Sequence, residues 1–155
     1  MFIEKNAKFA LIGHGLNIFH LYEELIKHKF PKPIVISHEK KFHARDIREN
    51  KDDIKLYKNI EWLEKKTAVY YVKSLDSNKF INILKNNNVN YIFSCSSRFI
   101  FKKHIINKFP NRIFNIHPSH LPSDKGGGTF TMRILNNDFK CSACIHLIDE
   151  GIDTG

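Results

Sequence analysis

Two polar side chains near the C-terminal end of the chain could act together on a carbonyl group. Asn115 and His117 stand two residues apart at the end of the apolar run 112–116. Side chains alternate along a strand, so these two are expected to project to the same side. An amide and a protonated imidazole donate to an oxygen that becomes negative during attack, and a neutral imidazole accepts a proton. The pair is therefore suited to acyl transfer.

A third group is needed to control the charge of the imidazole. A carboxylate can hold the ring in its cationic form and relay the proton that leaves an attacking amine. Asp153 is the best placed candidate, because it lies in a Gly-Ile-Asp-Thr-Gly turn whose flanking glycines allow tight folding back towards a site. The alternative interpretation is structural, with Asn115 and His117 as a satisfied loop pair and Asp153 as part of a turn.

The spacing of these residues resembles a known family. The segment 115–126 reads Asn-x-His-Pro-Ser-x-Leu-Pro followed by a Lys-Gly step, and 146–155 reads His-x-x-Asp-Glu-Gly-x-Asp-Thr-Gly. Both are similar to the signature of the folate-dependent formyltransferases, which move a formyl group from 10-formyltetrahydrofolate to an amine. The resemblance implies a catalytic trio of Asn115, His117 and Asp153, with 10-formyltetrahydrofolate as formyl donor and no metal.

The same resemblance implies that two further segments bind the folate. One follows the apolar run 91–95 and would line the pterin pocket, and the other is a loop that closes over the ring. The residues concerned are Arg98, Phe99, Ile100, Ile148, Asp149, Glu150 and Gly151. An equally weighted alternative sends the side chains of the first segment into the core. His146 also matches a family histidine and is interpreted as structural or supporting.

Alternating strand and helix patterns are expected to position these residues. Apolar runs predict strands at 8–12, 33–37, 68–72, 91–95, 112–116 and 140–148. Helical spacing predicts helices around 18–26, 44–49, 60–63, 76–86, 102–107 and 129–136. The order indicates an α/β fold, Rossmann-like and doubly wound, with a mostly parallel sheet and helices on both faces. Residues 1–155 are interpreted as one catalytic domain that is C-terminally incomplete, since the resembled family continues past this turn.

Other conspicuous polar residues receive structural interpretations. The Gly13-His14-Gly15 turn is expected to serve the backbone, although its amides could hold a phosphate or carboxylate of the acceptor. His38 and His43 fall in a charged segment and are expected at the surface. Cys141 and Cys144 form a Cys-x-x-Cys within a predicted strand, without a second ligand pair, so zinc or redox chemistry is not expected.

Composition narrows the class of protein. At 42% hydrophobic residues the chain can form a core, and no apolar run approaches the length of a membrane span. Three cysteines, and an N-terminal stretch without a signal-peptide pattern, favour the cytoplasm. The net charge of +9 is spread along the chain, which is typical of a solvated basic surface. Oligomeric state is left open.

The sequence leaves the identity of the acceptor amine open. Members of the resembled family formylate methionyl-tRNA, glycinamide ribonucleotide or amino sugars on a nucleotide carrier. Acidic and basic residues balance in 38–53, where tRNA enzymes usually carry a basic loop, and the Gly13-His14-Gly15 turn differs from the ribonucleotide enzymes. A nucleotide-linked amino sugar is therefore favoured, with tRNA second. A different class of function, a catalytically inactive folate-fold module that binds RNA or a partner, stays open.

Overall fold

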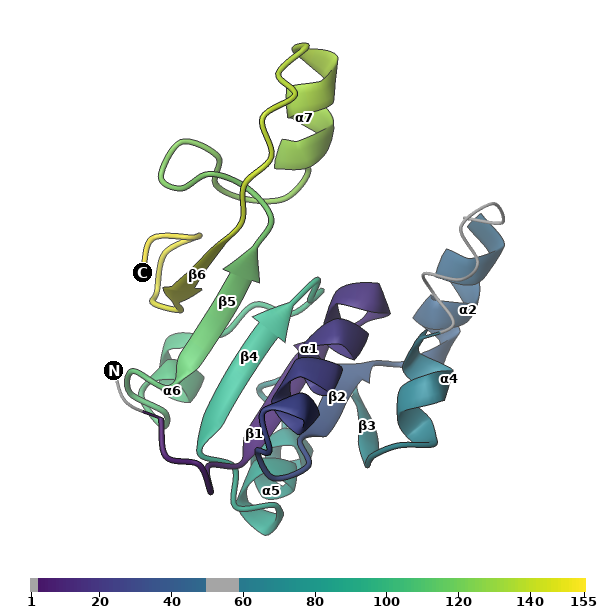
Figure 1. Ribbon diagram of the computed structural model, residues 1–155. Coiled ribbons are helices and arrows are strands. Elements are labelled where there is room, and N and C mark those ends of the chain that lie inside the picture. The colour runs from purple at the N-terminus through teal and green to yellow at the C-terminus, as the bar shows by residue number, and fades with distance from the viewer. Residues whose placement is uncertain (1–2, 50–58) are drawn as a thin grey trace.

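The computed structural model describes residues 3–49 and 59–155, which form one six-stranded sheet flanked by helices (Figure 1). The strands are β1 (Phe9–Gly13), β2 (Ile34–His38), β3 (Val69–Val72), β4 (Tyr91–Cys95), β5 (Ile113–His117) and β6 (Cys144–Leu147). The helices are α1 (Gly15–Lys27), α2 (Lys40–Glu49), α4 (Asn59–Glu64), α5 (Asn78–Asn86), α6 (Lys103–Ile106) and α7 (Thr129–Leu135). None of these helices is long and apolar enough to cross a membrane.

The sheet has the strand order β3-β2-β1-β4-β5-β6. All neighbouring strands from β3 to β5 run parallel, and the direction of winding reverses between β1 and β4. In a doubly wound sheet such a reversal places ligands beyond the carboxyl ends of the strands. The predicted Rossmann-like, mostly parallel α/β fold is confirmed.

The last strand differs from its prediction in length and direction. β6 covers only Cys144–Leu147 of the predicted run 140–148 and pairs antiparallel with β5. Figure 1 shows the reason, because α7 lies beyond the carboxyl end of β5 and the chain re-enters the sheet from that end. As a result, residues of β6 lie opposite the catalytic candidates of β5.

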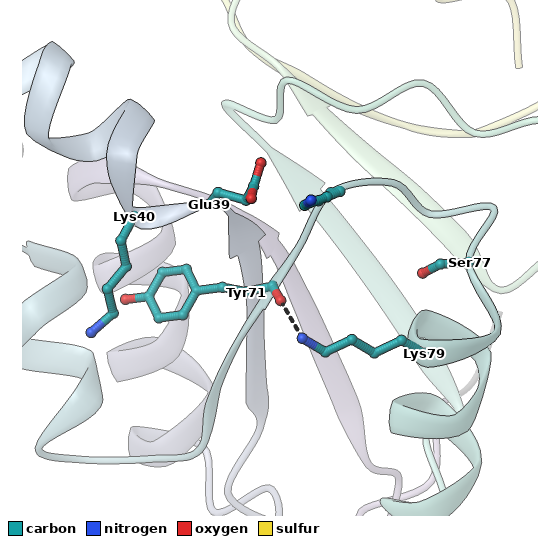
Figure 2. A pocket seen from close by; sticks show the side chains of 6 residues that line it. Glu39, Lys40, Tyr71, Ser77 and Lys79 are labelled. Atoms are coloured by element: carbon teal, nitrogen blue, oxygen red, sulfur yellow. Dashed lines mark hydrogen bonds between the residues drawn. The ribbon is translucent and has the colours of Figure 1, made fainter.

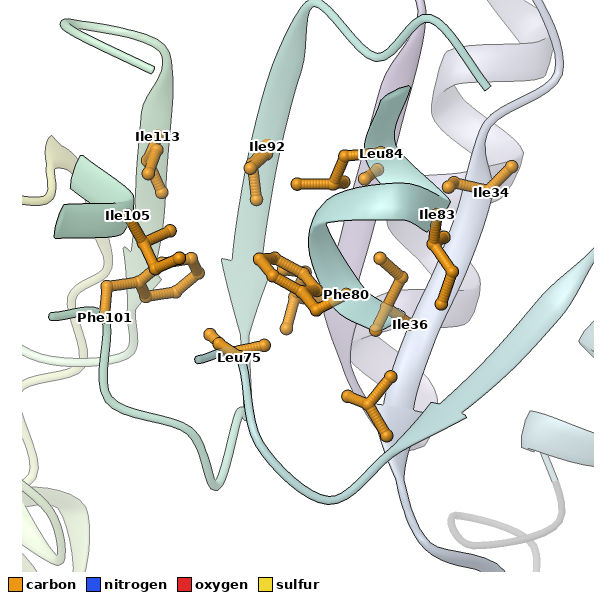
Figure 3. Close-up of a cluster of buried hydrophobic side chains, with 13 residues drawn as sticks. Ile34, Ile36, Leu75, Phe80, Ile83, Leu84, Ile92, Phe101, Ile105 and Ile113 are labelled. Carbon is orange, nitrogen blue, oxygen red and sulfur yellow. The ribbon is translucent and has the colours of Figure 1, made fainter. Parts of the chain in front are cut away.

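The two faces of the sheet bury separate apolar clusters. On β1, Ala10 and Ile12 belong to one cluster, whereas Phe9 and Leu11 belong to the other. The first cluster is completed by α5 and α6, and Figure 3 shows their side chains meeting those of β2, β4 and β5. The second is completed by α1 and α4. Helices therefore cover both faces, and the central strands are buried on both sides.

Helix α5 illustrates how local sequence places an element. Ser77 adopts an extended conformation and its Oγ accepts a hydrogen bond from the Phe80 amide at 3.2 Å, which caps the helix. Phe80, Ile83 and Leu84 then face the core and are buried. The predicted helix start at Asp76 and Ser77 and its apolar face are both confirmed.

The prediction that His38 and His43 lie at the surface is wrong. His38 is 4% exposed and His43 6% exposed, and their rings stack at 4.0 Å. Strand β2 extends one residue further than predicted, and α2 begins at Lys40, so His43 returns over the carboxyl edge of the sheet. There its Nε2 lies 3.2 Å from the Ser37 hydroxyl. Residues 50–53 of the predicted exposed excursion fall outside the described residues.

Candidate active site

Asn115 and His117 occupy the carboxyl-terminal half of β5. Asn115 lies between Ser94 of β4 and His146 of β6 in the sheet register. His117 is the last residue of the strand and is 5% exposed. Because the two are separated by one residue, they share a face of the sheet, and both side chains reach the same carboxylate.

That carboxylate is Asp153. Its Oδ1 lies 3.4 Å from the Asn115 amide nitrogen, and its Oδ2 lies 3.5 Å from the His117 Nδ1. The Gly126 amide donates to the same Oδ2 at 2.8 Å. The structure therefore brings together all three members of the trio named from the sequence, with the Asp153 carboxylate within 3.5 Å of both other side chains.

The turn that presents Asp153 is closed by hydrogen bonds to a second carboxylate. The Asp149 Oδ1 accepts from the Thr154 hydroxyl at 2.5 Å and from the Gly151 amide at 3.0 Å. These donors hold the pKa of Asp149 below its usual range, because they stabilise its charged form. Asp153 itself has φ +49°, in the left-handed region. Asp149, expected beside the pterin, thus acts here in shaping the turn.

His146 is a fourth polar member that the sequence placed only as a supporting residue. Its Nε2 lies 3.2 Å from the Asn115 amide nitrogen and 3.4 Å from the Asp153 Oδ1. Its Nδ1 lies 2.8 Å from the Leu147 carbonyl, which can only accept, so Nδ1 carries a proton. In the neutral ring Nε2 is then an acceptor that orients the Asn115 amide. The antiparallel pairing of β6 is the signal that would have placed His146 here.

A loop residue holds the other side of the His117 ring. The His117 Nε2 lies 2.6 Å from the Asp124 carbonyl oxygen, while the Asp124 carboxylate binds Ser119 and Arg133. The Arg133 guanidinium holds the pKa of Asp124 below its usual range. Sequence reasoning missed Ser119, Asp124 and Arg133, because no pattern marks a contact between a loop and the following helix.

The two expected folate segments lie side by side. An ion pair of 2.8 Å joins Lys103, which begins α6, to Glu150. Phe99 packs against the core, whereas Ile100 is 82% exposed. Phe99 is half-buried, with its side chain directed to the core as the alternative interpretation expects, whereas the side chain of Ile100 is available to a ligand.

The remaining residues of these segments are placed as follows. The Ile148 amide donates to the Ile113 carbonyl at 2.9 Å, and the Ile148 side chain packs against the same core cluster. Arg98 and Gly151 are exposed. The backbone of 148–151 therefore extends from the edge of β5 to the turn that holds Asp153.

A separate cavity lies near the other edge of the sheet, away from β5 and β6. It encloses about 540 Å³ near the carboxyl ends of β2 and β3 and is lined by Glu39, Lys40, Tyr71, Lys73, Ser77 and Lys79. Figure 2 shows the Lys40 side chain beside the Tyr71 ring and the hydrogen bond of 2.9 Å from Lys79 to the Tyr71 carbonyl. None of the trio lines this cavity, so the cavity is separate from the candidate reacting centre.

The structure shows why glycine is needed at Gly13, and it shows where Cys141 and Cys144 lie. A Cβ on Gly13 would lie 1.8 Å from the Cys95 carbonyl oxygen, so the close approach of β1 to β4 requires glycine there. Cys141 is exposed and Cys144 half-buried, and both are free thiols. Within residues 3–49 and 59–155, no group of His, Cys, Asp and Glu side chains is arranged to hold a metal ion.

Comparison with known proteins agrees with this geometry. The sequence model of a family described as formyl transferase matches residues 7–155. Methionyl-tRNA formyltransferase of Rickettsia felis is 35% identical over 92 residues, covering 59% of this chain and 30% of that protein. The matched segment therefore spans less than a third of the length of that relative.

Solved structures show the same fold at lower sequence identity. Phosphoribosylglycinamide formyltransferase from Anaplasma phagocytophilum superposes with a TM-score of 0.74 at 21% identity, covering 97% of this chain and 69% of that one. Glycinamide ribonucleotide transformylase 1 from Symbiobacterium toebii gives 0.72 at 17% identity, covering 99% and 71%. At these identities the likeness concerns the fold.

Proposed function

Since this chain belongs to the formyl transferase family, we propose that it transfers a formyl group from 10-formyltetrahydrofolate to a primary amine. The observation that supports this proposal is the meeting of Asn115, His117 and Asp153 at the carboxyl edge of the sheet. An amide, an imidazole and a carboxylate in contact supply an oxyanion donor, a proton carrier and its counter-charge.

The reaction begins with attack of the neutral amine on the formyl carbon. A carbon–nitrogen bond forms, and the carbonyl electron pair moves onto oxygen, where the Asn115 amide stabilises the negative charge. The proton released by the amine passes to His117 or Asp153, directly or through a water. The bond from carbon to the folate nitrogen then breaks, and that nitrogen takes up the proton as tetrahydrofolate leaves.

The Asn115 amide nitrogen already has two neighbours, so it has to give up one of these contacts before it can donate to the substrate oxygen. It lies 3.2 Å from the His146 Nε2 and 3.4 Å from the Asp153 Oδ1. The longer contact is the weaker one, and losing it frees an N–H for the oxyanion. His146 keeps the amide oriented during this exchange, which assigns it an orienting role.

The donor is expected along the segments that include Arg98, Phe99, Ile100 and 148–151. The exposed Ile100 offers an apolar surface for a pterin ring, and the backbone of 148–151 offers hydrogen-bonding groups next to Asp153. The exposed Lys103–Glu150 ion pair joins the start of α6, which follows the first segment, to the second segment. Substitution of Ile100 by Asp is expected to raise the KM for the folate more than it changes kcat.

For the acceptor, we favour an amino sugar carried on a nucleotide. The balanced charge of 38–53 supports a small acceptor, and the Gly13-His14-Gly15 turn opens at the same edge as the trio. Methionyl-tRNA is the second candidate, because the relative from Rickettsia felis is named for that reaction and the net charge is +9. In either case the reacting group is a primary amine.

An assay with 10-formyltetrahydrofolate and a panel of amines tests the proposal. The panel should contain nucleotide-linked amino sugars, methionyl-tRNA and glycinamide ribonucleotide. Formylation of one class, lost in the His117→Ala variant, is the expected result. If no amine is formylated while RNA binds with a steep salt dependence, the binding-module interpretation replaces this one.

A further inference from the structure

The loop between β5 and α7 holds two members of the trio through its backbone. The Asp124 carbonyl accepts from the His117 Nε2 at 2.6 Å, and the Gly126 amide donates to the Asp153 Oδ2 at 2.8 Å. Because these groups are two residues apart in one loop, its position sets the separation between the imidazole and the carboxylate.

The loop is in turn anchored by the Asp124 side chain. The Arg133 Nε and Nη2 converge on the Asp124 Oδ2 at 2.6 Å and 2.5 Å, and the Ser119 hydroxyl donates to the same oxygen at 2.9 Å. Ser119 is 2% exposed, and the Arg133 side chain is 18% exposed. Charge-assisted contacts of this length, largely shielded from water, are stronger than ordinary surface pairs.

The geometry at His117 determines which nitrogen can exchange a proton. A carbonyl oxygen only accepts, so the Nε2 that faces Asp124 must be protonated. The Nδ1, 3.5 Å from Asp153, is then the nitrogen that gains and loses the proton. If the loop moved, the ring could rotate or change tautomer, and Nδ1 would no longer face the carboxylate.

From these contacts we propose that Asp124 and Arg133 are positioning residues that fix the orientation and tautomer of His117. The proposal rests on the proposed formyl transfer, to which it adds two residues that touch neither substrate. Arg133 also donates from Nη1 to the Asp138 Oδ2 at 2.9 Å, so Asp138 belongs to the same network. A matched control comes from another ion pair, in which the Glu23 Oε1 of α1 lies 3.2 Å from the Lys66 Nζ and which includes no residue of the loop or the trio.

The test compares Arg133→Met, Arg133→Lys, Asp124→Asn and the control Glu23→Gln. Arg133→Met is expected to lower kcat on the order of 10- to 100-fold with little change in KM, because misplacing a catalytic group has this scale of effect. Arg133→Lys should recover part of the loss, and Glu23→Gln should stay near wild type. The kcat of Arg133→Met should also depend on pH differently from that of the wild type.

A spectroscopic measurement separates this proposal from the proposed function. In ¹H–¹⁵N spectra, the hydrogen-bonded Nε2–H proton of His117 should be visible in the wild type and in Glu23→Gln. It should weaken or vanish in Arg133→Met and in Asp124→Asn, where thermal unfolding checks that the fold is kept. This readout needs no acceptor, so it tests the positioning contact even if no amine in the panel reacts.

The outcomes against the proposal are equally definite. An unchanged Nε2–H signal together with unchanged kcat in Arg133→Met would overturn it. If Arg133→Met does not fold, Arg133→Lys and Asp124→Asn carry the same comparison. The Nε2–H signal could respond to the substitutions as expected while the protein formylates no amine. That result would count against the proposed function, and the contact between the loop and His117 would still be established.

Discussion

The parts of the chain before and after Ile113 are held together in different ways. The fully buried apolar side chains of the core lie between Ala7 and Ile113, whereas most of the large exposed ones follow Thr129. In Figure 1, α7 stands away from the helices that cover the sheet. The first part is stabilised by apolar burial, and the second by hydrogen bonds and ion pairs.

The candidate active site lies at the junction of these two parts. Asn115 and His117 stand on a strand whose first residue belongs to the core, while Asp153, Asp124 and Arg133 come from a region in which none of the described apolar side chains is fully buried. This division predicts that stability and activity depend on different residues. Substitutions on either side of Ile113 should therefore separate the free energy of unfolding from the rate of formyl transfer.

The largest effect is expected from the trio itself. His117→Ala and Asp153→Asn should each lower kcat on the order of 10³- to 10⁴-fold, or about 4 to 5.5 kcal/mol of activation free energy. Asp153→Asn should also leave the thermal midpoint nearly unchanged. Steady-state kinetics and calorimetry on the same samples provide the check, and near-normal turnover in both variants would refute the assignment.

A core substitution should give the opposite pattern. Phe80 is completely buried between α5 and the sheet (Figure 3), so Phe80→Ala should lower the free energy of unfolding by about 3 to 5 kcal/mol. The kcat of the molecules that remain folded should be close to wild type, because the trio is held by polar contacts among β5, the loop after it and the C-terminal turn. Urea denaturation, with activity scaled to the folded fraction, measures both quantities.

Gly13→Ala should lower the free energy of unfolding by less than Phe80→Ala does. A methyl group at this position would overlap the Cys95 carbonyl, and the backbone φ of +146° is one that side chains rarely adopt. A loss of about 1 to 3 kcal/mol in the free energy of unfolding is expected. Gly126→Ala is the matched control for a positive φ, because a Cβ there meets no atom within 4 Å. Equal losses in the two variants would show that the close approach is unimportant.

A smaller effect is expected at the start of α5. Ser77→Ala removes the oxygen that accepts from the Phe80 amide and should cost about 1 kcal/mol of stability. Ser77→Asp retains an acceptor and should recover most of that loss. Thermal unfolding of the two variants gives the comparison, and activity should be unaffected in both.

The smallest effect concerns acid stability. The pKa of Asp124 is below its usual range because Arg133 stabilises the carboxylate, so this contact stabilises the folded state above about pH 4. That contribution is lost as the pH falls through the lowered pKa. The wild type should therefore lose more stability between pH 5 and pH 2 (roughly the titration range of carboxyl groups) than Asp124→Asn does. Denaturation midpoints across that range would show parallel curves if the contact were unimportant.

The division at Ile113 also explains what the sequence could predict. Strand β4 has its predicted bounds, because Tyr91, Ile92 and Phe93 favour a strand and polar residues stand on either side of it at Asn90 and Ser96. The trio was recognised because its residues fall in two contiguous motifs. The contacts of His146 could not be predicted from the sequence, because they depend on the antiparallel direction of β6. Asp124 and Arg133 were missed because they meet only in the tertiary structure. Local patterns carry information about burial and motifs, and far less about polar contacts across a loop.

The left-handed backbone at Asp153 limits how this site can change over time. Only glycine, asparagine and aspartate adopt φ near +49° readily, so few other side chains fit the turn without cost. A descendant that gave up catalysis while keeping its shape should hold Asn or Gly at this position. The residue type found there in natural variants would thus report whether the chemistry is still under selection.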